Sequence, residues 1–125
     1  FIEEPEAHLH PRAVTRLARL IGVAVGYKNM IVISTHSDHL LVALNNLIAL
    51  SKVKGGAERL SFRGIEAIDP AMVAAYLVVA EGRRAVAREF RVEDTGIPED
   101  EFAKVTEELL EERSRIYDEL QGAQL

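Results

Sequence analysis

The chain has 125 residues, of which 48% are hydrophobic and 28% are charged, and its formal net charge is −5. This length suits one domain that buries roughly two-thirds of the surface of its unfolded chain. The absence of cysteine excludes disulfide frameworks and cysteine-bound zinc, and no apolar run reaches the roughly 20 residues of a membrane span. With no secretion signal, we expect a cytoplasmic location. The acidic balance leaves DNA a possible but unsupported partner.

The N-terminal region predicts a strand, a helix and a second strand. Phe1 and Ile2 are apolar and lead into three acids and a proline, which end a strand. Apolar residues recur at helical spacing from 11 to about 25, and Pro11 suits the first turn of that helix. The apolar run 30–33 is of the β-branched kind that parallel sheets bury. Because the chain opens at Phe1 without an initiator methionine, we expect it to be a piece of a longer protein.

The two predicted strands end in polar residues that we expect to meet. A strand, a helix and a strand within about 35 residues form a βαβ unit, whose two strands run parallel. Glu3 and Glu4 follow the first strand, whereas Ser34, Thr35 and His36 follow the second. The carboxyl ends of parallel strands share one edge of the sheet, where open α/β sheets bind ligands. These side chains are therefore expected at a common binding edge.

The remainder of the chain predicts a second helix, a hairpin and a long terminal helix. The second helix covers 38–51, with Ser37 as its N-cap. Residues 52–68 are expected to form a loop or a short strand. Two strands joined by a turn predict a hairpin within 69–98. Helical spacing of apolar residues, with acids at the start, predicts a helix over 99–121 that packs on its own domain.

Two adjacent acids at a strand end can divide the tasks of nucleotide hydrolysis. Hydrolysis needs a cation that neutralises the phosphates and a base that orients and deprotonates the attacking water. We expect Glu3 to be the metal residue, facing Mg²⁺ through water, and Glu4 to hold the attacking water. His36 would donate a hydrogen bond to the γ-phosphate or to that water. The expected cofactors are ATP and Mg²⁺, and the expected catalytic residues are Glu4 and His36.

The order of these motifs resembles that of ABC-type ATPases. One apolar strand ends in Glu3-Glu4-Pro5-Glu6-Ala7-His8-Leu9-His10-Pro11, and the next ends in Ser34-Thr35-His36-Ser37. Together they look like the Walker B, D-loop and switch-histidine series. The resemblance is closest to the prokaryotic AAA-type ATPases related to the SMC, RecF and OLD families. It covers 1–44 strongly and 68–98 weakly, whereas 52–67 match no known motif.

This resemblance implies a fold, a set of roles and a partner. The fold would be α/β, the C-terminal part of an ABC/SMC-type P-loop NTPase with a parallel βαβ core, a β-hairpin and a long C-terminal helix. Glu4 would be the catalytic base, Glu3 the Walker B acid and His36 the switch histidine. Residues 5–11 would be the D-loop, which contacts the opposite subunit in that family, so we expect a homodimer of the intact protein. The residues expected to bind the nucleotide are Glu6, His10, Ser34 and Thr35.

The sequence contains no phosphate-binding loop. Neither a G-x-x-x-x-G-K-[ST] run nor a Ser-Gly-Gly signature occurs in the 125 residues. That loop supplies the backbone N–H cradle, the lysine and the Mg²⁺-binding hydroxyl of such sites. We expect an N-terminal ATPase half to supply both motifs and these residues alone to be inactive. The gap left by its central strand would be filled by another polypeptide, by a different sheet closure or by pairing between copies.

Three other interpretations compete with an ATPase. The chain could be a non-catalytic scaffold or interaction module that keeps the half-fold with idle acids. It could be the ATPase part of an OLD-like nuclease, although no Asp-x-Asp metal motif follows Glu81-Gly82. The four histidines could hold zinc, but D-loop and surface-helix positions account for them better. We prefer the ATPase because the segments 3–11 and 34–37 occur in the order, and at the separation along the chain, that the resembling family shows.

Overall fold

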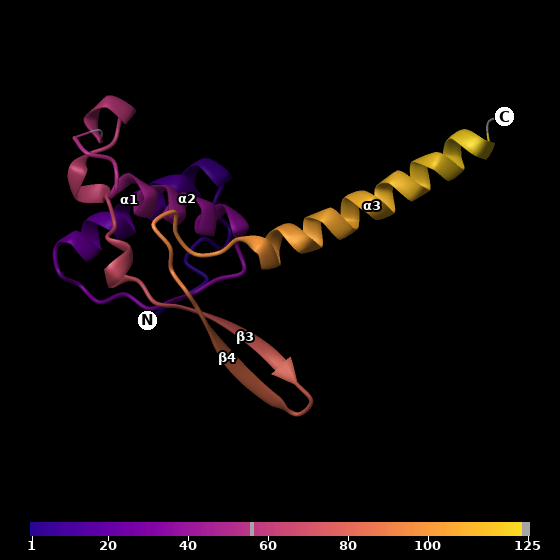
Figure 1. Ribbon diagram of the computed structural model, residues 1–125, viewed down its shortest axis with the longest axis horizontal. Coiled ribbons are helices and arrows are strands. Elements are labelled where there is room, and N and C mark those ends of the chain that lie inside the picture. The colour runs from indigo at the N-terminus through magenta and orange to yellow at the C-terminus, as the bar shows by residue number, and fades with distance from the viewer. Residues whose placement is uncertain (56, 124–125) are drawn as a thin grey trace.

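The structure is a computed structural model that describes residues 1–55 and 57–123. It combines two small sheets with two packed helices and a long C-terminal helix (Figure 1). A hairpin and the last helix leave the body of the molecule in different directions (Figure 1). This mixed α/β architecture is compatible with part of a P-loop ATPase.

The body of the molecule is built on helices α1 (Pro11–Gly26) and α2 (Asp38–Leu50). Pro11 opens α1, where its missing N–H would have no helical partner. Leu40, Leu47 and Ile48 of α2 are almost fully buried. Because these apolar side chains interdigitate with one face of α1, burial of both faces holds the two helices together. The α1 residues in this core are Val14, Ala18 and Ile21.

Strands β1 (Ile2–Glu3) and β2 (Ile33–Ser34) pair in parallel over two residues each. The prediction of a buried run over 30–33 is wrong for half of its residues. Ile31 and Ile33 pack against the helical core, whereas Met30 is 91% and Val32 51% exposed. Successive side chains of an extended chain point to opposite faces, and here only one face is covered by helices.

Residues 58–72 form three short 3₁₀ turns and no strand, which differs from the strand alternative for 52–68. The turns are η1 (Glu58–Leu60), η2 (Gly64–Glu66) and η3 (Pro70–Met72). Glu66 is only 4% exposed, and its carboxylate lies between two guanidinium groups, with Arg63 Nε at 3.1 Å and Arg19 Nε at 3.6 Å. A buried carboxylate is tolerated only with such partners, so this ion pair network fixes η2 on α1.

The hairpin predicted within 69–98 consists of β3 (Ala75–Glu81) and β4 (Arg84–Phe90), which pair antiparallel over their full length. Gly82 in the turn has a φ of 62°, a left-handed conformation that glycine adopts at little cost. Tyr76 and Val78 lie on one face and are mostly exposed. The hairpin projects from the body (Figure 1). Its apolar side chains Tyr76 and Val78 on this face are open to solvent.

Helix α3 (Asp100–Ala123) begins one residue later and ends two residues later than the predicted range 99–121. The expectation that it packs on its own domain is wrong, because every side chain described from 103 to 123 is exposed. Buried Asn45 of α2 sets its starting point: its amide donates to the Ile97 carbonyl at 2.8 Å and to Glu99 Oε2 at 2.9 Å. In the described part of the chain, no helix is long and apolar enough to span a membrane.

We predict that Gly22→Ala destabilises the fold. Gly22 lies where α1 meets η2, and an added Cβ would overlap the backbone carbonyl oxygen of Glu66. Because a backbone atom cannot rotate away, we expect a loss of about 1–3 kcal/mol in the free energy of unfolding, measured in urea.

The matched control is Gly122→Ala, also a helical glycine, whose added Cβ meets nothing within 4 Å. This change is expected to leave the unfolding free energy unchanged or slightly higher, because alanine favours helix. Equal stability of Gly22→Ala and the wild type would contradict the close approach of α1 and η2.

Candidate functional site

The candidate site lies where β1 and β2 end at the same edge of their sheet. Backbone pairing continues one residue past β1, because the Glu4 N–H donates to the Ser34 carbonyl at 2.8 Å. Glu4 then turns the chain with a φ of 44°. A non-glycine residue with positive φ is uncommon, and such strained residues cluster at functional sites. Glu4 shares a positive φ with His8, Lys28 and Ser61, so this conformation marks the turn after β1 and does not by itself identify the site.

Glu4 and His36 come together at this edge, as the strand order predicted. The distance from His36 Nε2 to Glu4 Oε1 is 3.8 Å, and the two side chains are 93% and 47% exposed. An imidazole and a carboxylate at this separation can share a small polar ligand between them. Because both remain open to solvent, a ligand can reach them without any rearrangement of the core.

Glu3 and Ser34 are direct neighbours in the parallel register and complete the same edge. Among the described residues, no group of three or more His, Asp or Glu side chains could hold a metal ion. This finding gives no support to a zinc site. Mg²⁺ is a different case, because it keeps several waters and binds through one or two carboxylates plus substrate phosphates. The exposed Glu3 carboxylate fits such a single contact.

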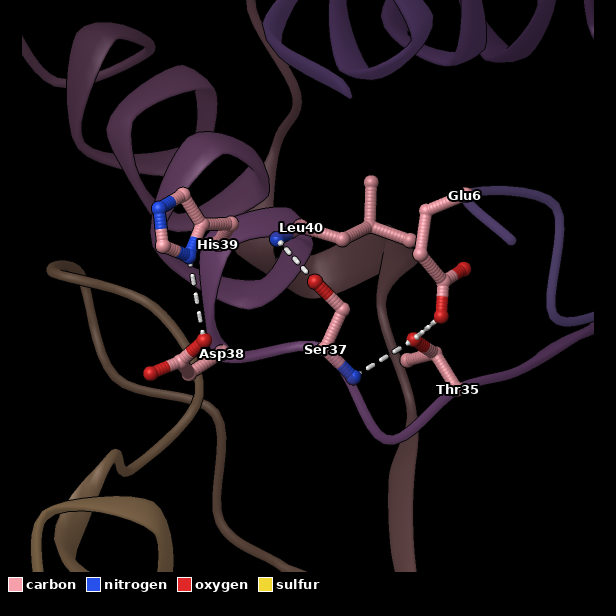
Figure 2. A network of polar contacts seen from close by, with 6 residues as sticks. All are labelled: Glu6, Thr35, Ser37, Asp38, His39 and Leu40. Atoms are coloured by element: carbon pink, nitrogen blue, oxygen red, sulfur yellow. Dashed lines mark hydrogen bonds and ion pairs between the residues drawn. The ribbon is translucent and has the colours of Figure 1, made fainter. Parts of the chain in front are cut away.

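A second group of polar side chains joins the turn after β1 to the loop before α2 (Figure 2). Thr35 Oγ1 donates to Glu6 Oε1 at 2.5 Å and accepts from the Ser37 N–H at 3.0 Å. Ser37 Oγ in turn accepts from the Leu40 N–H at 3.1 Å and so caps α2, as predicted. Four residues from two segments are thus connected by three hydrogen bonds.

His10 is not part of this group and instead caps the start of α1. Its Nδ1 accepts a hydrogen bond from the Arg12 backbone N–H at 3.2 Å, which makes it the N-cap of α1. The structure therefore brings Glu3, Glu4, Ser34 and His36 to one edge and pairs Glu6 with Thr35. The nucleotide-binding roles expected for Glu6, His10, Ser34 and Thr35 stay predictions.

The direct contact between Glu6 and Thr35 was not predicted from the sequence. The two residues are 29 positions apart, and neither lies in a periodic pattern that places its side chain. A weak signal existed, because each stands beside an expected catalytic residue, Thr35 next to His36 and Glu6 two residues after Glu4. Convergence of two strand ends brings their neighbours together as well.

We predict that His39→Ala raises the pKa of Asp38. The hydrogen bond from His39, at 3.1 Å, is the main cause that holds the pKa of this exposed carboxyl below its ordinary value of 3.8. A lowered folded-state pKa stabilises the fold above the unfolded-state pKa, and this contribution is lost as the pH falls through the lowered value. NMR titration of the Asp38 carboxyl carbon measures the shift. His8→Ala, which changes a histidine on the turn after β1, is expected to leave the Asp38 titration unaltered.

Comparison with known proteins gives one match to this region. Residues 1–43 match the family model described as "AAA domain, putative AbiEii toxin, Type IV TA system". No curated protein and no solved structure matches the chain significantly. The matched residues include the whole candidate edge from Glu3 to His36. The match supports an AAA-type P-loop ATPase family and indicates a nucleotide-binding, ATPase-like function.

Proposed function

We propose that this chain supplies the water-activating part of an ATP-hydrolysing site, as the C-terminal portion of an ABC/SMC-type ATPase. The observation that carries the proposal is the approach of His36 Nε2 to Glu4 Oε1, at 3.8 Å, from the ends of two parallel strands. A carboxylate at a sheet edge can serve as general base for an attacking water, and an imidazole beside it can donate a hydrogen bond to that water or to a phosphate. The family match over the same residues supports a nucleotide as the substrate.

Glu4 acts as the general base in this proposal. Its carboxylate accepts a hydrogen bond from the attacking water and takes its proton as the water oxygen bonds to the γ-phosphorus. The bond from that phosphorus to the β–γ bridging oxygen breaks, and ADP leaves with the electron pair. His36 donates a hydrogen bond to the γ-phosphate or to the water, and so fixes the line of attack. Positioning of this kind carries most of the catalysis in phosphoryl transfer, because the protein does little covalent chemistry there.

Glu3 is the metal-binding residue in this proposal. Bound Mg²⁺ would neutralise the phosphate oxygens, and the single Glu3 carboxylate would hold it through its water shell. The 125 residues contain no G-x-x-x-x-G-K-[ST] run that could cradle the phosphates. We therefore propose that a P-loop-bearing ATPase half completes the site and that these residues alone do not turn over ATP.

Uncovered apolar side chains beside β2 and on the hairpin agree with such a completed site. Met30 and Val32 face solvent beside β2, and Tyr76 and Val78 face solvent on the hairpin. Exposed sheet surfaces of this kind are normally paired or covered. We propose that the ATPase half covers these side chains. We also propose that residues 5–11 contact a second subunit of a homodimer. The proposed location of the protein is the cytoplasm.

We predict that Glu4→Gln abolishes turnover while ATP still binds. The amide keeps the shape of the side chain but cannot take a proton, so kcat should fall by about 10²–10⁴ with little change in ATP affinity. The measurement is steady-state ATP hydrolysis and nucleotide binding by the product of the complete open reading frame.

Glu119→Gln on α3 is the control, since it makes the same chemical change on an exposed helix outside the candidate edge and the hairpin, and should leave kcat unaltered. Glu4-independent turnover would refute the assignment of the base. A wild-type protein that neither binds nor hydrolyses ATP would favour the scaffold or interaction module. Nuclease activity that depends on ATP would favour the OLD-like alternative.

A further inference from the structure

We propose that Glu6 is a positioning residue, which holds the loop 35–37 and thereby sets the place of His36 relative to Glu4. This inference rests on the proposed function, because it assigns Glu6 to the control of that same site. It does not require Glu6 to touch the nucleotide. The role is argued from the contacts that join the two segments of the site.

Glu4 and His36 lie on separate segments that soon lose their backbone connection. The last backbone hydrogen bond between the segments runs from the Glu4 N–H to the Ser34 carbonyl, one residue before Thr35. Past this point, the polar contacts between the two segments in the described parts of the chain are Glu6 with Thr35 and Glu4 with His36. The second of these is a 3.8 Å approach between exposed groups, which stabilises little by itself.

Thr35 uses its hydroxyl both as a donor and as an acceptor. The hydroxyl has one proton, which goes to Glu6, and its oxygen accepts the Ser37 N–H (Figure 2). His36 stands between these two anchors, and Ser37 is in turn fixed by its cap on α2. Glu6 therefore holds one end of the loop while α2 holds the other. The imidazole projects from a loop whose backbone cannot shift without breaking one of these bonds.

The Glu6 side chain is well placed for this role. Its backbone is held in a tight turn, because the Leu9 N–H donates to the Glu6 carbonyl at 3.0 Å. Its second oxygen, Oε2, is buried and accepts no hydrogen bond from the described residues. Loss of the Thr35 contact would leave a part-buried carboxylate without its hydroxyl donor, which costs free energy. That cost favours the conformation in which the loop is closed on Glu6.

Two pairs of variants test the link on the product of the complete open reading frame. Glu6→Ala removes the acceptor and Thr35→Val removes the hydroxyl at nearly constant volume. Glu6→Gln keeps an acceptor oxygen and Thr35→Ser keeps the hydroxyl. We expect the first pair to lower kcat for ATP by on the order of ten- to a hundredfold with a smaller change in KM, because a misplaced catalytic group mainly costs the chemical step. The second pair should restore most of that loss.

A double-mutant cycle shows whether Glu6 acts through His36. If it does, Glu6→Ala causes no further loss of kcat in a His36→Ala background. A loss of the same size in both backgrounds would overturn the positioning role, since Glu6 would then act on the reaction by another route. Equal kcat for Glu6→Ala and the wild type would overturn it as well.

Amide hydrogen exchange in the 125-residue chain reports the link without turnover. Exchange of the Ser37 N–H, which donates to Thr35, should be faster in Glu6→Ala and Thr35→Val but unchanged in the conservative variants. Protection of Leu47 and Ile48 amides in the core shows that each variant remains folded. Unaltered Ser37 exchange in Thr35→Val would overturn the loop assignment. If Glu4→Gln hydrolyses ATP as fast as the wild type, the proposed function is refuted. The positioning role is then refuted too, even if Ser37 exchange is faster in Glu6→Ala.

Discussion

The packing of α1 against α2 is the constraint on which the rest of the structure depends. The parallel strands pair over only two residues each, so their hydrogen bonds cannot hold the sheet edge by themselves. Each strand is instead followed along the chain by one of the two helices, α1 after residues 4–10 and α2 after residues 35–37. The apolar faces of those helices bury Leu40, Leu47 and Ile48. The strand ends, and the acids and histidine that follow them, therefore stand where the helix pair puts them. A change in the core would therefore move the site as well.

The site itself divides into an open part and a supported part. Glu4 and His36 are exposed and depend on neighbours for their placement, whereas Glu6, Thr35 and Ser37 are partly buried and bonded to one another. Rigid support beneath accessible groups suits a site that must admit a large charged ligand and still present its base at a fixed place. The same division explains why Glu4 tolerates a strained backbone, since the bond to Ser34 and the turn after it hold that conformation.

Sequence reasoning predicted well whatever depends on local pattern. Periodic apolar residues with Pro11 and Ser37 at the starts predicted α1 and α2, and the order of strands predicted that Glu4 and His36 would meet. It failed where the outcome depends on what surrounds an element. Met30 has the composition of a buried strand residue but lies uncovered, and α3 has an apolar stripe that packs on nothing in the described structure. Contacts between distant polar side chains, such as Asn45 with Ile97 or Glu6 with Thr35, follow no period and could not be predicted.

The isolation of α3 has a consequence for how the molecule unfolds. At 24 residues the helix is about 36 Å long. The segment just before it, with Ile97 and Glu99, is tied to the body through Asn45, whereas the described side chains from 103 to 123 are exposed. A helix without tertiary contacts draws its stability from local propensity alone and frays from its free end. Its opening therefore requires no disruption of Leu40, Leu47 or Ile48, so heat should melt α3 and the α1–α2 body as separate cooperative units. The far-ultraviolet circular dichroism of this chain would then decay in two stages, and a single melting temperature would describe neither.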